Sequence, residues 1–141
     1  MDFGELLNEL ALSLNALHRR DICGRRETLA QCFILSSVPD DGIHMSSLAV
    51  KLGIDNSTLT RLIGNLEKKE FAFRRLDEDD RRVINVFLTD AGRDLLTTFT
   101  ERLNLLGQRI LDDLPAEKRE GIKDSIELLL WSLSRELLKT S

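Results

Sequence analysis

Hydrophobic residues recur at helical spacing at both ends of the chain. The N-terminal part predicts an amphipathic helix from Glu5 to about Ile22, because leucine repeats at the i, i+4 and i+8 positions of one face. Towards the other end, apolar residues step by three and four from Leu96 to Ile110, which indicates a heptad-like helix. Pro115 begins a further helix with one apolar side. Both ends therefore carry apolar helix faces that need a partner, and we expect a homodimer.

Between these ends, polar cap residues and turns separate shorter helices. Thr28 is an N-cap candidate for a helix that runs to about Val38. Residues 39–42, which read Pro-Asp-Asp-Gly, end that helix in a turn. A short helix follows over Ser46–Leu52, and His44 leads into it from the turn. The spacing of these elements predicts a compact helical unit in the middle of the chain.

The hydrophobic period then changes from helical to alternating. Phe71–Leu76 and Val83–Leu88 alternate as strands do, and the polar residues 77–82 between them form a hairpin tip. Thr89 caps the long helix that follows, with Asp90 in its first turn. The expected order is helix, helix, short helix, helix, two-stranded hairpin, long helix, helix. The predicted fold class is mainly α with a small β-hairpin.

Composition and charge narrow the class of protein. The chain has 141 residues, 42% hydrophobic and 31% charged, which fits one folded domain. Its net charge of −4 disfavours a non-specific nucleic-acid coat, although a sequence-specific binder needs only a local basic strip. Apolar runs are too short to span a membrane, and acidic Asp2 and Glu5 replace a basic signal segment. We expect a cytoplasmic protein without a membrane partner.

The helices on either side of Gly53 predict a helix-turn-helix. Asp55 or Asn56 caps the second helix, whose leucines and isoleucine form one apolar face towards the core. In this motif the second helix lies in the major groove of DNA. Its other face carries donors and acceptors suited to base edges and phosphates. These are Asn56, Ser57, Thr58, Thr60, Arg61, Asn65 and Lys68. The hairpin behind it, with Arg81 and Arg82 at its tip, forms a wing that suits a narrow minor groove.

Several motifs in series resemble the MarR (multiple antibiotic resistance regulator) family of winged helix-turn-helix regulators. They are Thr28-Leu29-Ala30-Gln31, Thr58-Leu59-Thr60-Arg61-Leu62, Asp80-Arg81-Arg82 and Leu88-Thr89-Asp90-Ala91-Gly92-Arg93. The resemblance covers about Thr28 to Leu96. It implies a winged domain over 28–96 between dimerisation helices at 1–27 and 97–141.

The resemblance also implies a function. A dimer of this kind is a transcriptional regulator, most often a repressor, on a pseudo-palindromic operator. Asn56, Ser57, Thr58, Thr60 and Arg61 would lie at the major groove. Arg82 matches the wing arginine, Asp80 matches the acid that supports it, and Arg81 and Lys68 would contact phosphate. A small effector, often an anionic aromatic compound, would bind between the arms and the winged domain, near Leu14 to His18.

Two departures from the family pattern stand out. Glu70 follows the recognition helix where the family has glycine in a left-handed cap, which predicts about 1 kcal/mol of strain. Four consecutive acids, 77–80, lie opposite four arginines at positions 74, 75, 81 and 82. This charge pattern predicts modest non-specific DNA binding.

Other readings of the same residues stay open. Arg81 and Arg82 could neutralise the neighbouring acids, and a winged helix can serve as a protein-interaction module, which the acidic composition supports. Cys23 lies close in sequence to arginines and keeps a redox role open, whereas Cys32 in an apolar run reads as a buried, inert thiol. His18, Cys23, Cys32 and His44 lack zinc-site spacing, and no cofactor is expected. No catalytic motif is present in the sequence, so we expect no enzyme.

Overall fold

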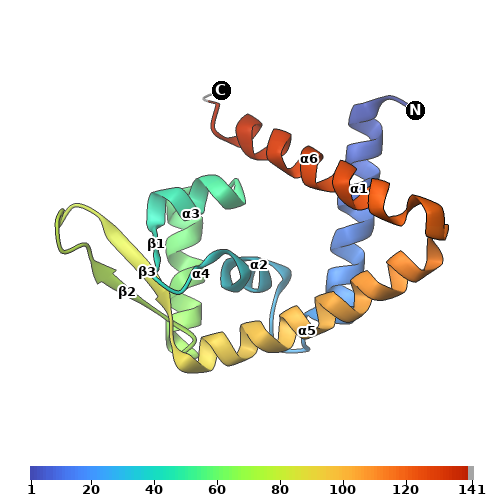
Figure 1. The fold of residues 1–141 in the computed structure, drawn as a ribbon. Coiled ribbons are helices and arrows are strands. Elements are labelled where there is room, and N and C mark those ends of the chain that lie inside the picture. The colour runs from blue at the N-terminus through green and yellow to red at the C-terminus, as the bar shows by residue number, and fades with distance from the viewer. Residues whose placement is uncertain (140–141) are drawn as a thin grey trace.

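The chain folds mainly into helices around one small sheet (Figure 1). The computed structural model describes residues 1–139. Its helices are α1 (Phe3–Leu17), α2 (Leu29–Ser37), α3 (Met45–Leu52), α4 (Asn56–Lys68), α5 (Asp90–Asp113) and α6 (Arg119–Leu137). Its strands are β1 (Ile43–His44), β2 (Ala72–Leu76) and β3 (Ile84–Leu88). The predicted fold class, mainly α with a small β wing, is confirmed.

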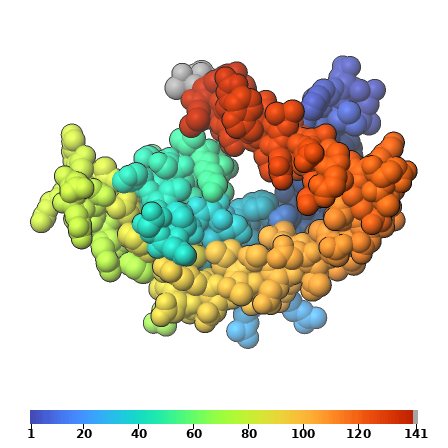
Figure 2. Space-filling model, in the orientation of Figure 1, coloured from blue at the N-terminus to red at the C-terminus, as the bar shows by residue number. Residues whose placement is uncertain are grey.

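The long helix α5 connects two regions of the chain, the winged domain and the terminal helices α1 and α6 (Figure 1). One end of α5 carries the winged domain, made of α2 to α4 and the sheet, and the other end leads to α6 near α1. Figure 2 shows α6 running back from the far end of α5 towards α3, with the end of α1 beside it, and we call α1 and α6 the arms. The expected boundary between residues 96 and 97 falls inside α5, which continues unbroken. Residues 140–141 of the expected C-terminal arm lie outside the described residues.

Side-chain caps fix where three of the helices begin. The hydroxyl of Thr28 accepts the backbone N–H of Gln31 at 3.2 Å, and the Gln31 side chain accepts the N–H of Thr28 at 3.0 Å. Asp55 caps α4 and Thr89 caps α5 in the same way. Gly53 ends α3 in the left-handed conformation with φ 67°, as the sequence predicts. Local polar signals therefore determine the limits of the winged domain's helices.

The sheet has three strands rather than the two expected. β1 pairs with β3 through Ile43 opposite Val86 and His44 opposite Asn85, so the order is β1-β3-β2. His44 thus belongs to a strand as well as preceding α3, which corrects the expectation of a simple turn. A two-residue strand has too few alternating positions to show a period, which is why the sequence did not reveal it.

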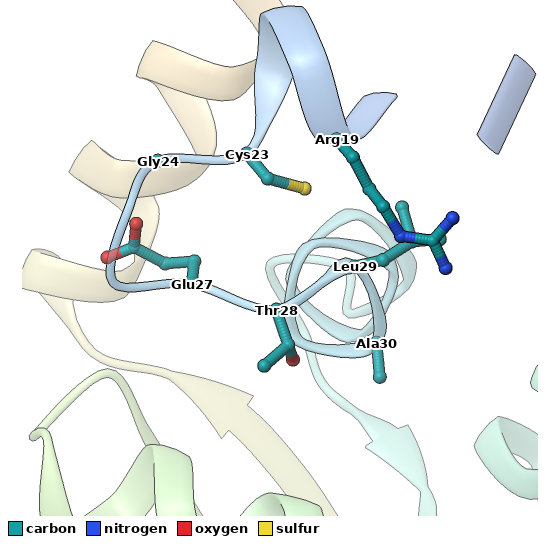
Figure 3. Close-up of a pocket in the computed structure, with 7 residues that line it drawn as sticks. All are labelled: Arg19, Cys23, Gly24, Glu27, Thr28, Leu29 and Ala30. Carbon is teal, nitrogen blue, oxygen red and sulfur yellow. The ribbon is translucent and has the colours of Figure 1, made fainter. Parts of the chain in front are cut away.

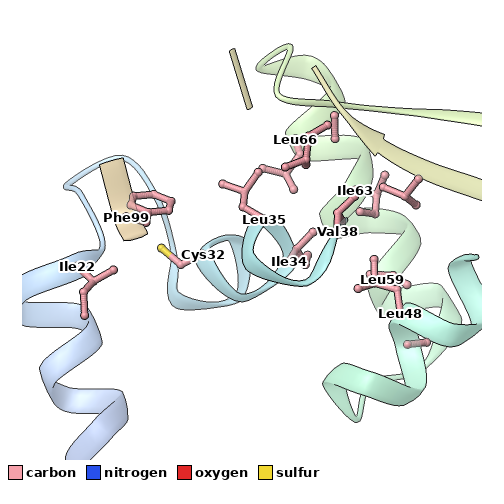
Figure 4. Close-up of a cluster of buried hydrophobic side chains, with 14 of the residues drawn as sticks. Ile22, Cys32, Ile34, Leu35, Val38, Leu48, Leu59, Ile63, Leu66 and Phe99 are labelled. Atoms are coloured by element: carbon pink, nitrogen blue, oxygen red, sulfur yellow. The ribbon is translucent and has the colours of Figure 1, made fainter. Parts of the chain in front are cut away.

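The winged domain closes around one apolar core (Figure 4). α2 contributes Ile34 and Leu35, and α4 contributes residues from its apolar face, all with no exposed surface. Val86 of the sheet belongs to the same cluster, and Phe99 of α5 joins it beside Cys32 and Ile22 (Figure 4). Burying such side chains contributes about 1.5–3 kcal/mol each to the stability of the winged domain. These residues therefore find their apolar partners within one chain.

The arms, in contrast, bury almost nothing within one chain. No residue of α1 or α6 is fully buried, and Trp131 is 59% exposed. The first helix continues as expected to Ile22, but its last turn, His18–Ile22, is π-helical. Pro115 precedes a 3-10 turn, Ala116–Lys118, and α6 begins only at Arg119, later than predicted. Within residues 1–139, no helix is long and apolar enough to cross a membrane.

Candidate nucleic-acid interface

α4 separates its apolar and polar side chains onto opposite faces. Leu59, Ile63 and Leu66 are fully buried, and Leu62 is half-buried against the same core. The polar residues predicted for DNA contact divide into two groups by exposure. Asn56, Ser57, Thr60, Arg61 and Lys68 are exposed, whereas Thr58 and Asn65 are half-buried. The helix therefore offers a polar face to solvent along its whole length.

Asp55 organises the start of this face. Its Oδ1 accepts the backbone N–H of Thr58 at 2.7 Å and the hydroxyl of Ser57 at 2.8 Å. These hydrogen bonds, the one from the Thr58 backbone first, hold the pKa of the Asp55 carboxyl below its usual range. Of the two cap candidates, Asp55 is therefore the cap and Asn56 is the first helical residue. Ser57 still has lone pairs with which to accept a further hydrogen bond.

Asp80 holds Arg82 at the tip of the wing. The Arg82 backbone N–H and Nε donate to Oδ1 of Asp80 at 3.0 and 3.1 Å, and Nη2 donates to Oδ2 at 3.2 Å. The hydrogen bond from the Arg82 side chain is the main reason that the pKa of Asp80 lies below its usual range. The Arg82 side chain remains 90% exposed, so it is oriented by Asp80 yet open to a ligand.

The two arginines of β2 contact other partners than the acidic run. Arg74 forms an ion pair with Glu67 of α4 at 2.7 Å, and the guanidinium of Arg75 lies 5.0 Å from the centre of the Phe73 ring. Strand alternation explains the difference, since neighbouring residues of β2 point to opposite sides of the sheet. Among the described residues, Arg82 is the one arginine with an ion pair to an acid of the run.

A groove joins the start of α4 to the wing. It has a volume of about 340 Å³, and residues from α3, α4 and both wing strands line it. The polar members of its lining are Ser46, Asn56, Thr60, Arg74 and Arg82. Ser46 and Arg74 were not among the residues predicted for DNA contact. The position of Arg74 could have been found from strand pairing. Arg74 lies opposite Val86 in the β2–β3 pair and so shares a face of the sheet with the buried strand residues.

A second pocket lies where the end of α1 faces the start of α2 (Figure 3). Arg19, Cys23, Glu27 and Thr28 line this space of about 390 Å³. The Sγ atom of Cys23 is 2.8 Å from the Sγ atom of Cys32, which is buried as expected. No sequence pattern indicated that the two thiols touch. Over residues 1–139, no three His, Cys, Asp or Glu side chains gather as metal ligands.

Comparison with known proteins identifies the domain. The MarR family model matches residues 28–84, from the cap of α2 into β3. The transcriptional repressor MdtR of Bacillus subtilis is 31% identical over 96 residues, which cover 62% of this chain and 62% of MdtR. Residues 28–84 therefore match the MarR family. This family consists of transcriptional regulators, and the chain spans about half the length of the curated relatives that it matches first.

Solved structures extend the likeness beyond the matched domain. A transcriptional regulator from Thermotoga maritima is 27% identical, with a TM-score of 0.65 over 98% of both chains. Apo MarR from E. coli is 22% identical, with a TM-score of 0.80 over 92% of this chain and 97% of the other. The arms as well as the winged helix-turn-helix therefore share the MarR architecture.

Proposed function

We propose that this chain is a sequence-specific, double-stranded DNA-binding transcriptional regulator. The observation that carries the proposal is the groove that α4 and the wing share, with Asn56 and Thr60 on one side and Arg82 on the other. A helix with short polar side chains suits the wide major groove, and an arginine held beside it suits the adjacent minor groove. The chain therefore presents both elements at one groove.

The candidate DNA-contact residues of α4 and the wing form two groups by their position along the helix and the hairpin. Asn56, Ser57, Thr58, Thr60 and Arg61 lie in the N-terminal half of α4, where recognition helices meet base edges. Asn65, Lys68 and Arg81 lie further along α4 or at the wing tip, where side chains contact phosphate. Among residues 1–139, Arg61, Lys68 and Arg81 form no ion pairs, so their charges remain available. MepR of S. aureus, a structural neighbour, was solved with an oligodeoxyribonucleotide.

The functional unit in this proposal is a homodimer. Large apolar side chains on α1, α5 and α6 stay exposed, among them Leu10, Ile110, Leu130 and Trp131. A surface of this kind is unfavourable in water, and a second copy of the chain would cover it. Two recognition helices related by a two-fold axis would then read a pseudo-palindromic operator. A repressor role is supported by the name of the relative MdtR.

An effector would regulate binding by preferring one spacing of the two recognition helices. The pocket beside Arg19 supports this part of the proposal, because it lies where α1 meets the winged domain. Its lining offers the Arg19 guanidinium to a small anionic aromatic compound and also includes the carboxylate of Glu27. PcaV of Streptomyces coelicolor, another structural neighbour, was solved with its natural ligand.

Selection of bound sites from random duplex DNA tests the proposal. We expect a two-fold symmetric site with half-sites about one helical turn, roughly 10 base pairs, apart. Fluorescence anisotropy on that site should show affinity that falls as salt rises, because bound phosphates release counterions. If no site is enriched by a folded dimer, with or without candidate effectors, the winged helix serves as a protein-interaction module instead.

A further inference from the structure

The two cysteines of the chain meet at the junction between an arm and the winged domain. Cys23 ends the π-helical turn after α1, and Cys32 lies in α2. Their Sγ atoms are 2.8 Å apart. A disulfide bond requires about 2.05 Å, so the sulfur atoms need to approach by only about 0.8 Å. Both cysteines are free thiols in this structure.

The surroundings hold this pair in place. Arg102 of α5 donates from Nη1 to the carbonyl of Ile22 at 2.7 Å, which fixes the backbone beside Cys23. Arg109 of α5 donates from Nη2 to Asp21 at 3.0 Å and ties the same turn a second time. On the other side, the Thr28 cap fixes the start of α2 and hence the position of Cys32. The thiols are therefore brought together by contacts that do not involve the sulfur atoms.

The two thiols differ in their access to solvent. Cys23 lines the pocket of about 390 Å³ that Figure 3 shows, whereas Cys32 is 2% exposed and belongs to the core cluster with Ile22 and Phe99 (Figure 4). Burial is also the main reason that the pKa of the Cys32 thiol is strongly raised. A soluble oxidant can thus reach Cys23, and Cys32 is the protonated partner behind it.

We propose that Cys23 and Cys32 are an oxidation site at which a hydroperoxide produces a disulfide within one chain. The Cys23 thiolate attacks the terminal oxygen of the hydroperoxide, the O–O bond breaks, and the leaving alkoxide takes up the proton that Cys23 released. Cys23 is then a sulfenic acid. The sulfur of Cys32 attacks it, the S–O bond breaks, and water leaves with the Cys32 proton. Overall, two thiols are oxidised and one hydroperoxide is reduced to an alcohol and water.

The disulfide would close a ring over residues 23–32. This segment links α1 to the winged domain, and it includes exposed Arg25 and Arg26. Closing the ring removes rotations between the arm and the domain that the free thiols permit. The disulfide would form within one chain, and its formation does not depend on DNA binding.

Peptide mapping of the full-length protein tests the proposal. The protein is treated with cumene hydroperoxide, alkylated under denaturing conditions and digested with trypsin without reduction. Cleavage after Arg20, Arg25, Arg26 and Lys51 separates the two cysteines into the peptides 21–25 and 27–51. We expect these peptides to appear joined, with a mass two hydrogens below their sum. One equivalent of hydroperoxide should remove both thiols.

Two variants assign the roles. In Cys23→Ser, loss of the remaining thiol should slow at least about tenfold, because the buried Cys32 is shielded. In Cys32→Ala, Cys23 should stop at the sulfenic acid, which dimedone traps. Because Cys32 lies in the core, that variant is used only if its circular dichroism spectrum matches that of the parent protein. If the spectra differ, the peptide map of the wild-type protein alone decides whether the disulfide forms. Peptide 21–25 joined to a second copy of itself, or oxidised without any link to 27–51, would overturn the proposal.

Discussion

The winged domain and the arms use the same apolar residues with opposite results. In the winged domain, leucines and isoleucines from α2, α3 and α4 meet each other and are fully buried. In the arms, equally regular leucine patterns on α1 and α6 remain exposed in the single chain. The difference lies in the connections. Short turns such as that at Gly53 fold the domain helices onto one another, whereas α5 carries the arms away from them.

This difference shows that hydrophobic periodicity specifies a buried face but not what covers it. An apolar helix face gives the same sequence pattern of period 3.6 whether the next helix or a second chain covers it. The two regions should therefore respond differently to the same substitution. Damage to the winged domain should lower the stability of each chain, and damage to the arms should depend on protein concentration.

The largest effect should come from Gly92 at the start of α5. A Cβ atom at this position would collide with the backbone carbonyl of Phe71, which cannot move without shifting β2. Gly92→Ala should therefore cost at least about 3 kcal/mol of unfolding free energy, measured by urea denaturation. Gly107→Ala in the same helix is the control. Apart from the neighbouring backbone of α5 itself, no atom lies within 4 Å of a Cβ at Gly107, so that change should be neutral or stabilising by up to about 1 kcal/mol. Equal stability of the two variants would contradict the close approach.

The same leucine truncation in the two regions tests the comparison directly. Leu66 has no exposed surface, and Leu66→Ala should cost about 2–5 kcal/mol at any protein concentration. Leu133 of α6 is 40% exposed, and Leu133→Ala should instead weaken the proposed dimer about tenfold, measured by sedimentation. If Leu133→Ala lowers the stability of the chain as much as Leu66→Ala does, independently of concentration, the arm packs within its own chain.

The effect of removing one positive charge on DNA affinity should also depend on the region that loses it. Arg61 is exposed on the polar face of α4, and Arg61→Ala should weaken DNA binding by about 1–3 kcal/mol and relax base preference. Lys123 of α6 is the charge-matched control, and Lys123→Ala should leave binding nearly unchanged. Anisotropy titrations on the selected site, at one salt concentration, measure both. Similar losses for both variants would mean that net charge, and not the α4 face, governs affinity.

Most of the winged domain was predictable because its signals are local. Thr28, Asp55 and Thr89 mark helix starts by chemistry that acts within three residues, and the alternation around Val86 marks a strand. The contacts that the sequence did not show link distant segments. Arg74 to Glu67 and Cys23 to Cys32 depend on how the chain turns back on itself, and no local pattern encodes such a pairing. The strand β1 was missed because its two residues are too few to show an alternating period, and its pairing with β3 is also a contact between distant segments.

The smallest predicted effect concerns the end of the recognition helix. Glu70 has φ 62°, the left-handed conformation expected at the position where the family has glycine. It is the one residue other than glycine with positive φ within the described chain. The helix closes through the bond from the Phe71 N–H to the Leu66 carbonyl at 2.9 Å, so this conformation is required. Glu70→Gly should relieve the strain and stabilise the protein by about 1 kcal/mol.

The reverse substitution can be made at Gly53. It ends α3 with φ 67°, and no atom lies within 4 Å of an added Cβ, so Gly53→Ala tests the backbone conformation alone. This change should destabilise the protein by about 1 kcal/mol, and combined with Glu70→Gly it should restore the parent's midpoint in urea. If both glycine changes move the midpoint in the same direction, side-chain contacts of Glu70 outweigh its backbone strain. In that case the exposed carboxylate, and not the left-handed turn, explains why a glutamate is tolerated at the end of α4.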